Sequence, residues 1–155
     1  MSNRHSYKTQ LIWDGNLGDG TSTYAGYGRQ HHVSIDGKSD LQLTADPKFR
    51  GDAARHNPED LLLAAVSSCH MLSYLALCAR ASINVLDYRD EATGDLVLDM
   101  KGGGKFESIH LHPIVTIADA SQRERALELH EKAHELCFIA NSCSVPIHHH
   151  AEVRV

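Results

Sequence analysis

The first third of the chain alternates short apolar runs with polar and glycine-containing turns, a pattern that predicts strands. The candidate strands are residues 7–13, 23–35 and 41–44. The Asp36–Gly37 pair between the second and third runs is a hairpin-turn signal. Residues 45–56 contain one proline, one glycine and five charged residues, so we expect an ordered loop there.

A long and almost uniformly apolar segment follows, and it predicts a buried helix. Asn57 is a favourable N-cap, Pro58 suits the first helical position, and Glu59 and Asp60 complement the positive end of the helix dipole. Residues 61–79 are apolar on nearly all sides, as in helices that are buried in the middle of a protein. Because a chain of 155 residues can hardly cover such a helix completely, we expect a partner subunit to help cover it.

Residues 84–117 predict a run of strands. The first part, residues 84–100, predicts one long strand or two strands with a break near Gly94. Three consecutive glycines within residues 101–105 predict a hairpin loop. Residues 106–117 then alternate apolar and polar side chains with the period of a half-buried strand.

A second helix and a final strand complete the expected order. Ser121 and Glu124 have the spacing of a capping box, so we expect a helix from there to the region of Cys137. Residues 145–155 predict the last strand. The order of strands, buried helix, strands, helix and strand predicts an α+β fold with antiparallel sheet. The length favours a single domain over residues 1–155.

Composition and charge are those of a globular protein, and they argue against two kinds of partner. Hydrophobic residues make up 42% of the chain and charged residues 23%. The formal charge of −5, without a basic block or stripe, argues against nucleic acid as a partner. The longest apolar run, residues 61–66, is too short to span a bilayer, and we find no signal-peptide pattern. We therefore expect no membrane partner and a cytoplasmic location.

The cysteines are the first candidates for chemistry, and the chain has four of them: Cys69, Cys78, Cys137 and Cys143. A reducing cytoplasm disfavours structural disulfides, so catalysis, metal binding and plain burial remain open. Cys69 could be a small buried core residue, as free cysteines often are. The two serines before it, however, break an otherwise apolar helix and favour a polar site. Cys78 lies nine residues later, half a turn around the helix, so it is expected in the core.

Two separated motifs resemble those of a known family. Residues 57–62 (Asn-Pro-Glu-Asp-Leu-Leu) run on to Ser-Ser-Cys-His at residues 67–70, and residues 137–142 are Cys-Phe-Ile-Ala-Asn-Ser. Over nearly its whole length the chain resembles the osmotically inducible protein C and organic hydroperoxide resistance (OsmC/Ohr) family. The resemblance implies an OsmC-like α+β fold, with antiparallel sheets wrapped around long buried central helices in an intertwined homodimer. It also implies active sites at the subunit interface.

The resemblance further implies a thiol-dependent peroxidase that reduces organic hydroperoxides, and also hydrogen peroxide, in oxidative stress defence. Cys69 would attack the peroxide and become a sulfenic acid. Cys137 would then form a redox-active disulfide with Cys69, although the nearness of Cys143 leaves open which thiol resolves. An external dithiol, of which a lipoyl-type dithiol is one candidate, would reduce the disulfide. No cofactor and no metal are expected.

A cation is needed beside the reactive thiol, because burial alone makes a cysteine a poor thiolate. The helix dipole contributes little at Cys69, which lies several turns from Asn57. The family has an arginine and a glutamate that hold the thiolate. The resemblance assigns the glutamate to Glu59 and the arginine to Arg29, with Arg50 or Arg55 as open alternatives for the charge.

Two other kinds of site compete with this interpretation. His130, His134 and Cys137 fall at i, i+4 and i+7 of the second helix, where they could present zinc ligands on one face, although no CxxC motif supports the idea. Residues 148–150 are all histidine, and strand alternation would send His149 to one face and its neighbours to the other, giving weak metal affinity at the surface. The second alternative is a dimer that binds a small apolar ligand without peroxidase turnover.

Overall fold

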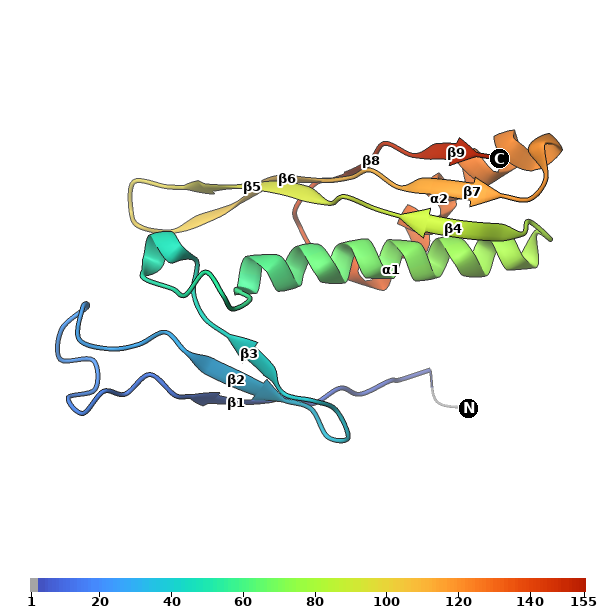
Figure 1. The fold of residues 1–155 in the computed structure, drawn as a ribbon. Helices are drawn as coiled ribbons and strands as arrows, with labels where there is room; N and C mark the ends of the chain where they lie inside the picture. Colours follow the sequence, from blue (N-terminus) through green and yellow to red (C-terminus); the bar gives the residue numbers. More distant parts are fainter. Residues whose placement is uncertain (1–2) are drawn as a thin grey trace. The chain divides into compact units, whose positions relative to one another are not determined.

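A computed structural model describes residues 3–155 of the chain (Figure 1). The chain separates into two compact units that meet between Leu61 and Leu62. The expectation of a single domain over residues 1–155 stays a prediction.

The first unit contains a three-stranded antiparallel sheet in the order β1-β2-β3. Its strands are β1 (Gln10–Trp13), β2 (His31–Ser34) and β3 (Leu41–Leu43). The second predicted strand is much shorter than expected because its first part forms turns, closed by a hydrogen bond of 2.8 Å from the Trp13 indole to the Gly28 carbonyl. The predicted hairpin turn is confirmed, with Gly37 at a positive φ of 74° that glycine adopts without strain.

The predicted loop after β3 is ordered. It contains a 3₁₀ turn, η1 (Pro47–Phe49), whose first residues are capped by the Asp46 side chain accepting from the Lys48 N–H at 2.7 Å. The loop returns to β3 through a hydrogen bond of 2.9 Å from the Thr44 N–H to the His56 carbonyl. This return brings the chain to the start of the long helix.

The long helix α1 (Pro58–Arg80) begins where the sequence predicts. The Asn57 side chain accepts from the Asp60 N–H at 2.8 Å, and the Asp60 carboxylate accepts from the Asn57 N–H at 3.2 Å. This reciprocal pair satisfies backbone donors that the first helical turn leaves without partners. The helix ends at Arg80, and Ser82 beyond it has a left-handed φ of 57° that lets the Ile83 N–H return to the Cys78 carbonyl at 2.9 Å.

Two sheets make up the β structure of the second unit. One has the order β4-β7-β9, from β4 (Val85–Arg89), β7 (Ile114–Ile117) and β9 (Glu152–Arg154). The other has the order β5-β6-β8, from β5 (Thr93–Leu98), β6 (Gly104–Leu111) and β8 (Ile147–His149). The predicted break before Gly94 is confirmed. The predicted strand of residues 106–117 is divided at His112 and Pro113, because proline cannot donate to a ladder.

The α+β fold class is confirmed, but the sheets are mixed rather than purely antiparallel. Strands β4 and β7 pair antiparallel, as do β5 and β6. The final predicted strand is divided into β8 and β9, which pair in parallel with β6 and β7. Parallel neighbours need a long crossover, and the helix that follows β7 supplies it.

The second helix, α2 (Arg123–Leu136), is followed by one short turn of helix, α3 (Phe138–Asn141). The predicted capping box at Ser121 and Glu124 is wrong. Asp119 takes the capping role instead, accepting from the Ser121 N–H at 2.9 Å and from the Ser121 hydroxyl at 2.7 Å. A 3₁₀ turn therefore precedes α2.

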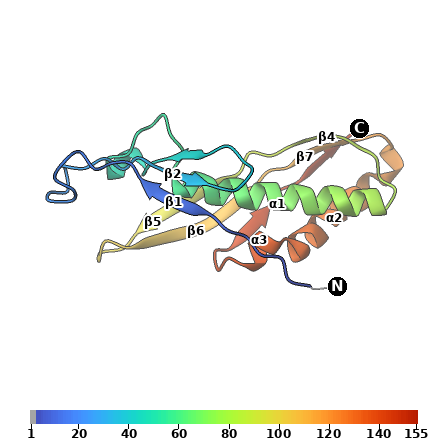
Figure 2. The ribbon, with the colours of Figure 1, turned by 90° about the horizontal axis from the view of Figure 1, so that it is seen from below.

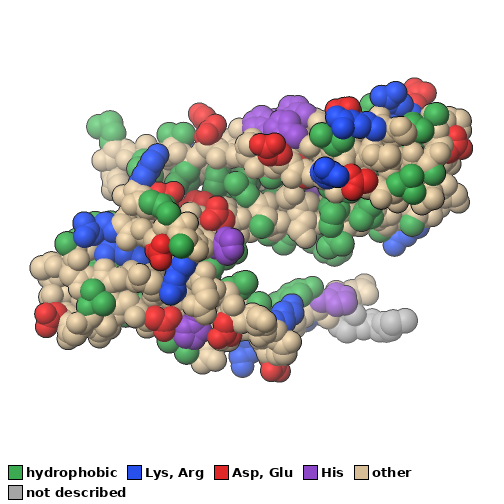
Figure 3. Space-filling model, in the orientation of Figure 1, with side chains coloured by type: hydrophobic (Ala, Val, Ile, Leu, Met, Phe, Trp, Pro, Cys, Tyr) green, Lys and Arg blue, Asp and Glu red, His purple; other side chains and the backbone are tan. Residues whose placement is uncertain are grey.

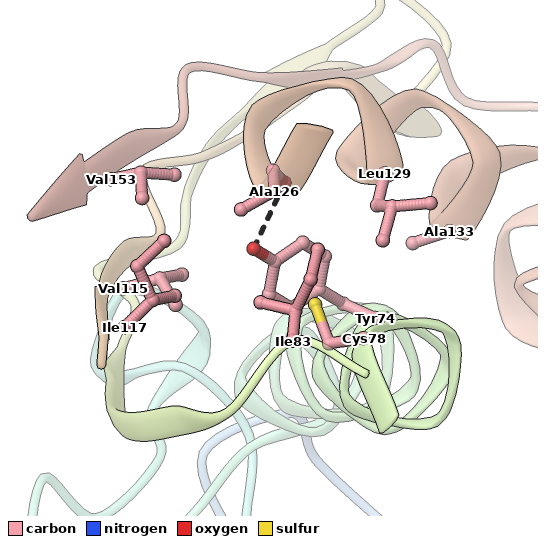
Figure 4. Packing of buried hydrophobic residues seen from close by; sticks show 9 residues of the cluster. All are labelled: Tyr74, Cys78, Ile83, Val115, Ile117, Ala126, Leu129, Ala133 and Val153. Carbon is pink, nitrogen blue, oxygen red and sulfur yellow. Dashed lines mark hydrogen bonds between the residues drawn. The ribbon is translucent and has the colours of Figure 1, made fainter. Parts of the chain in front are cut away.

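The core of the second unit lies between α1, α2 and the sheets. Figure 2 shows α2 alongside α1, and Figure 4 shows the larger of two apolar clusters, in which the Tyr74 hydroxyl donates to the Ala126 carbonyl at 2.9 Å. This cluster contains Tyr74, Cys78, Ile83, Val115, Ile117, Ala126, Leu129, Ala133 and Val153. A smaller cluster joins Val66 of α1 to Ile109 and Leu111 of β6.

Only one stripe of α1 is fully buried by its own chain. Its members recur at every fourth position of the helix and are Val66, His70, Tyr74 and Cys78. The other faces remain half-buried or exposed, although the helix is apolar nearly all round. The single chain therefore leaves much of an apolar helix without a covering layer.

By length and composition alone α1 could also cross a membrane, with a mean hydropathy of 1.8. The uninterrupted apolar run of residues 61–66 is much shorter than this helix, because serine and histidine follow it. These few polar residues lower the mean hydropathy of the whole helix only slightly. Within residues 3–155 no other helix passes the same test. The contacts of its buried stripe with the sheets and α2 are those of a core helix. The expectation of no membrane partner stays a prediction.

Candidate functional site

Cys69 and Cys137 come together in the second unit. Cys69 is partly exposed in the middle of α1, whereas Cys137 is 1% exposed and ends α2. The two thiols are close enough for Cys69 to raise the pKa of Cys137. This proximity follows from the packing of α2 on α1, because the shared core cluster lies beside it. The pairing implied by the family resemblance is therefore spatially possible.

Cys137 is held by the backbone around it. Its extended conformation, with φ −69° and ψ 113°, ends α2 and starts α3. Its sulfur accepts from the Ala140 N–H at 3.4 Å. Burial raises the pKa of the Cys137 thiol well above its ordinary value, and the nearby Cys69 thiol raises it further, while the Ala140 N–H lowers it. Cys137 is therefore a protonated thiol at neutral pH.

Cys69 opens onto a largely apolar groove of about 440 Å³ on the face of α1. The groove is lined by Cys69, Leu72, Ser73, Ala76, Leu77, Arg80, Leu136 and Phe138. Phe138 is 81% exposed at its rim. A small apolar molecule or an apolar side chain would fit such a surface, with the Cys69 sulfur within its reach.

Arg80 is a groove residue that the sequence analysis missed. Cys69, Ser73, Ala76 and Arg80 lie at i, i+4, i+7 and i+11, so one face of α1 carries all four. That spacing was the signal available in the sequence. Arg80 places a cation in the last turn of the helix, where it also complements the helix dipole.

Arg29, the arginine expected beside the thiolate, is held within the first unit. Its guanidinium carbon lies 3.9 Å from the ring centre of Tyr27 and 4.5 Å from that of Tyr24. It donates to the Tyr24 carbonyl at 2.6 Å and also to the Tyr27 carbonyl. These contacts fix the side chain in its loop by cation–π attraction and hydrogen bonding.

The expected contact of Arg29 with the Glu59 carboxylate is not formed among the residues that the structure describes. Across residues 3–155 no ion pair joins Arg29 to Glu59, which is half-buried in the first turn of α1. Of the alternatives, Arg50 is exposed, and Arg55 donates to the Gln42 side chain at 3.4 Å. The roles of Arg29 and Glu59 stay predictions.

A buried histidine pair joins the helices that carry the two cysteines. His70 of α1 and His130 of α2 are at most 1% exposed, and the His70 Nε2 lies 3.0 Å from the His130 Nδ1. Tyr74 stacks on His130 with ring centres 3.8 Å apart. Burial lowers the pKa of His70 to about 4 and that of His130 to about 3. Both imidazoles are therefore neutral at physiological pH.

The three residues of the second helix that form the alternative zinc site point to different partners. His130 is bonded to His70, Cys137 lies near Cys69, and His134 lies beside the ring of His149. As the side chains stand, residues 3–155 contain no group of three or more His, Cys, Asp or Glu residues arranged to hold a metal ion.

The fold and the cysteine pair define an α+β protein with a long central helix that presents one thiol to a second thiol from the neighbouring helix. The sequence model for "OsmC-like protein" matches residues 51–150. The chain belongs to the OsmC-like protein family, and the resemblance stated from its motifs is confirmed.

Individual relatives agree with this family. The uncharacterized protein YmaD of Bacillus subtilis (strain 168) is 30% identical over 101 residues, which span 64% of this chain and 63% of that protein. The solved structure of an OsmC-like protein of unknown function from Vibrio cholerae has a TM-score of 0.85 and 29% identity. That alignment covers 96% of this chain and 100% of the Vibrio chain.

Two similar structures are organic hydroperoxide resistance proteins. The protein from Elizabethkingia anophelis has a TM-score of 0.71 at 19% identity, covering 99% of each chain. OhrB of Bacillus subtilis has a TM-score of 0.62 at 24% identity, covering 97% of this chain and 98% of its own. At these identities the likeness concerns the fold.

Proposed function

We propose that the protein is a thiol peroxidase that reduces organic hydroperoxides with Cys69 as the attacking thiolate and Cys137 as the resolving thiol. The observation that carries the proposal is the proximity of these two thiols, one on α1 and one at the end of α2, which is close enough for Cys69 to raise the pKa of Cys137. The same fold is shared with proteins named for organic hydroperoxide resistance. Membership of the OsmC-like family supports the same assignment.

Burial divides the two roles. Cys69 is partly exposed and lines the groove through which a peroxide would approach. Cys137 is 1% exposed, and its raised pKa keeps it protonated. Since the thiolate is the nucleophile, a protonated Cys137 does not compete with Cys69 for the peroxide. It reacts only after Cys69 has become a sulfenic acid.

The reaction proceeds in three balanced steps. The Cys69 thiolate attacks the terminal peroxide oxygen, the O–O bond breaks, and the alkoxide leaves and takes a proton to become an alcohol. Cys69 is now a sulfenic acid. The Cys137 sulfur then attacks the Cys69 sulfur, its proton leaves with the departing hydroxide as water, and a disulfide forms. An external dithiol, of lipoyl type by family resemblance, returns both thiols by exchange and is itself oxidised.

The apolar groove favours an organic hydroperoxide over hydrogen peroxide. Leu72, Leu77, Leu136 and Phe138 would contact an alkyl or aryl substituent. Burying such a substituent contributes about 0.8 kcal/mol for each methylene group. Hydrogen peroxide has no group that uses this surface.

A homodimer completes the proposal. Leu72 on α1 is 61% exposed, and only 22% of the most apolar stretch of this helix is buried within the chain. Covering an exposed apolar face with a second copy is the expected response to the hydrophobic effect. The groove at Cys69 would then lie at the subunit interface, as the family resemblance implies.

The decisive experiment is a titration of the reduced protein with cumene hydroperoxide, followed by thiol counting and intact mass. Wild type should lose two thiols and two mass units. Cys69→Ser should lose none, whereas Cys137→Ser should gain oxygen atoms on Cys69 by further oxidation.

Cys143→Ser is the matched control, because Cys143 lies six residues beyond Cys137. It should behave as wild type if Cys137 resolves. Disulfide formation that survives in Cys137→Ser but not in Cys143→Ser would transfer the resolving role. Absence of fast thiol loss in wild type would contradict the peroxidase and favour a dimer that binds an apolar ligand.

A further inference from the structure

Four histidines lie on one face of the sheet β5-β6-β8. Two lie at the end of β6 and two at the end of β8: His110, His112, His148 and His150. The strands run in parallel, with His110 directly opposite His148. We call these four residues the histidine ladder. Figure 3 shows histidine side chains gathered in one surface patch of this unit (purple).

Strand alternation explains why the ladder faces outward. Ile109 and Leu111 of β6 are at most 1% exposed and pack with Val66 of α1. Their neighbours His110 and His112 must therefore point away from α1. His149 between the other two ladder residues turns inward and stacks on His70. The ladder is thus on the opposite face of the sheet from α1, which carries Cys69.

The ladder imidazoles are stacked in a row. Ring centres are 5.0 Å apart for His148 and His110, 5.3 Å for His110 and His150, and 5.0 Å for His150 and His112. Within the row, the His110 Nδ1 lies 3.0 Å from the His150 Nε2. Two ring nitrogens on neighbouring chain segments therefore face each other directly.

Neighbouring groups orient two of these rings. The His112 Nδ1 lies 3.0 Å from the Glu91 carbonyl. A carbonyl can only accept, so the proton sits on Nδ1 and the Nε2 lone pair of His112 is available. The His110 Nε2 lies 2.9 Å from the Ser108 hydroxyl. When the Ser108 hydroxyl accepts from the His110 Nε2–H, the Nδ1 lone pair of His110 faces His150. This is how metal-binding histidines are usually held.

We propose that the histidine ladder is a binding site for one divalent transition metal ion, held by the Nδ1 of His110 and the Nε2 of His150. A metal–imidazole bond of about 2.0–2.1 Å in a tetrahedral site places two nitrogens about 3.3 Å apart. The observed 3.0 Å is within a few tenths of an ångström of that separation. The ion takes the place of the proton shared by the two nitrogens, and His150 keeps its proton on Nδ1.

The third and fourth ligands come from the outer rings. The stacked rings of His112 and His148 do not converge on the His110–His150 pair as they stand, and both residues are exposed. In the proposed complex, rotation about their side-chain torsions would bring a further nitrogen to the ion, and for His112 this rotation would release its hydrogen bond to the Glu91 carbonyl. Imidazole ligands suit zinc, copper and nickel, whereas calcium and magnesium prefer oxygen.

Nickel binding to the reduced full-length protein, measured by isothermal titration calorimetry, tests the proposal. We expect one Ni²⁺ per chain, and a loss of affinity of about a hundredfold in His110→Ala and in His150→Ala. His112→Ala and His148→Ala should each weaken binding about tenfold. The matched controls are His5→Ala and His56→Ala, which remove exposed histidines outside the ladder and should bind as wild type.

The cysteines provide the competing explanation, because thiolates also bind metals. Cys69→Ser should retain wild-type affinity for nickel, and a loss there would overturn the proposal. Unchanged affinity in His110→Ala and His150→Ala would also overturn it. As a check in the unaltered protein, paramagnetic Ni²⁺ should broaden the imidazole NMR signals of the ladder before those of His5 and His56. Uniform broadening of all histidines would mean non-specific surface binding and no site.

Discussion

At the scale of single residues, the two cysteines differ in burial and therefore in chemistry. Cys69 faces a groove, whereas Cys137 lies inside the unit with its pKa raised. A thiolate at Cys69 still needs a cation. Arg29 is the family's candidate, although tyrosine contacts hold it in its loop, and Arg80 lines the same groove as Cys69.

Replacing the true cationic partner should lower the thiolate fraction of Cys69 at neutral pH about tenfold and slow its oxidation by peroxide to the same extent. We expect this result for Arg29→Gln and measure it by the ultraviolet absorbance of the thiolate against pH. Arg125→Gln, which alters an exposed arginine of α2 that is no candidate for the cation, is the control. An unchanged titration in Arg29→Gln together with a loss in Arg80→Gln would move the role to Arg80.

At the scale of elements, α1 and α2 are joined by the buried pair of His70 and His130. Their pKa values in the folded protein, about 4 and about 3, lie below the ordinary value of 6.5. The unfolded chain therefore binds these two protons more readily than the folded one. Stability is full above pH 6.5 and is lost as the pH falls toward 4.

We expect the free energy of unfolding to fall by about 3 kcal/mol between pH 6.5 and pH 5, because each of the two imidazoles contributes about half of this change. Urea denaturation at a series of pH values measures this. His130→Gln should flatten the dependence, because it removes one of the two buried imidazoles. The control His5→Gln should keep the wild-type slope. A wild type whose stability does not change in this range would mean that the pair titrates normally.

At the scale of the whole molecule, the exposed apolar face of α1 favours association with a second subunit, because association would remove that face from water. Leu72→Glu should convert the proposed dimer into monomer, because it places a charge where apolar side chains would pack. Light scattering coupled to size-exclusion chromatography reports the mass directly. Leu127→Glu on α2, where the native side chain is 47% exposed, is the control and should stay dimeric. A monomeric wild type would refute the intertwined assembly.

Sequence signals were reliable where the cause was local. The start of α1, the hairpin at Asp36 and Gly37 and the break before Gly94 depend on residues a few positions apart, and all are confirmed. The capping box at Ser121 failed because the nearby Asp119 competed for the same hydroxyl. The candidate thiols were found because serines interrupt an apolar helix and because the motifs resemble a family.

The α+β class, the long helix and the assignment of Cys78 to the core and of Cys69 and Cys137 as candidate thiols are readable in the sequence, since they follow from periodicity, caps and motifs within short segments. The parallel pairing of β8 with β6 and of β9 with β7, the proximity of Cys69 to Cys137 and the place of Arg80 in the same groove are known only from the folded chain. The same is true of the outward row of histidines on β6 and β8. These features join residues far apart in the chain, and no local pattern records which distant partner packing will bring alongside.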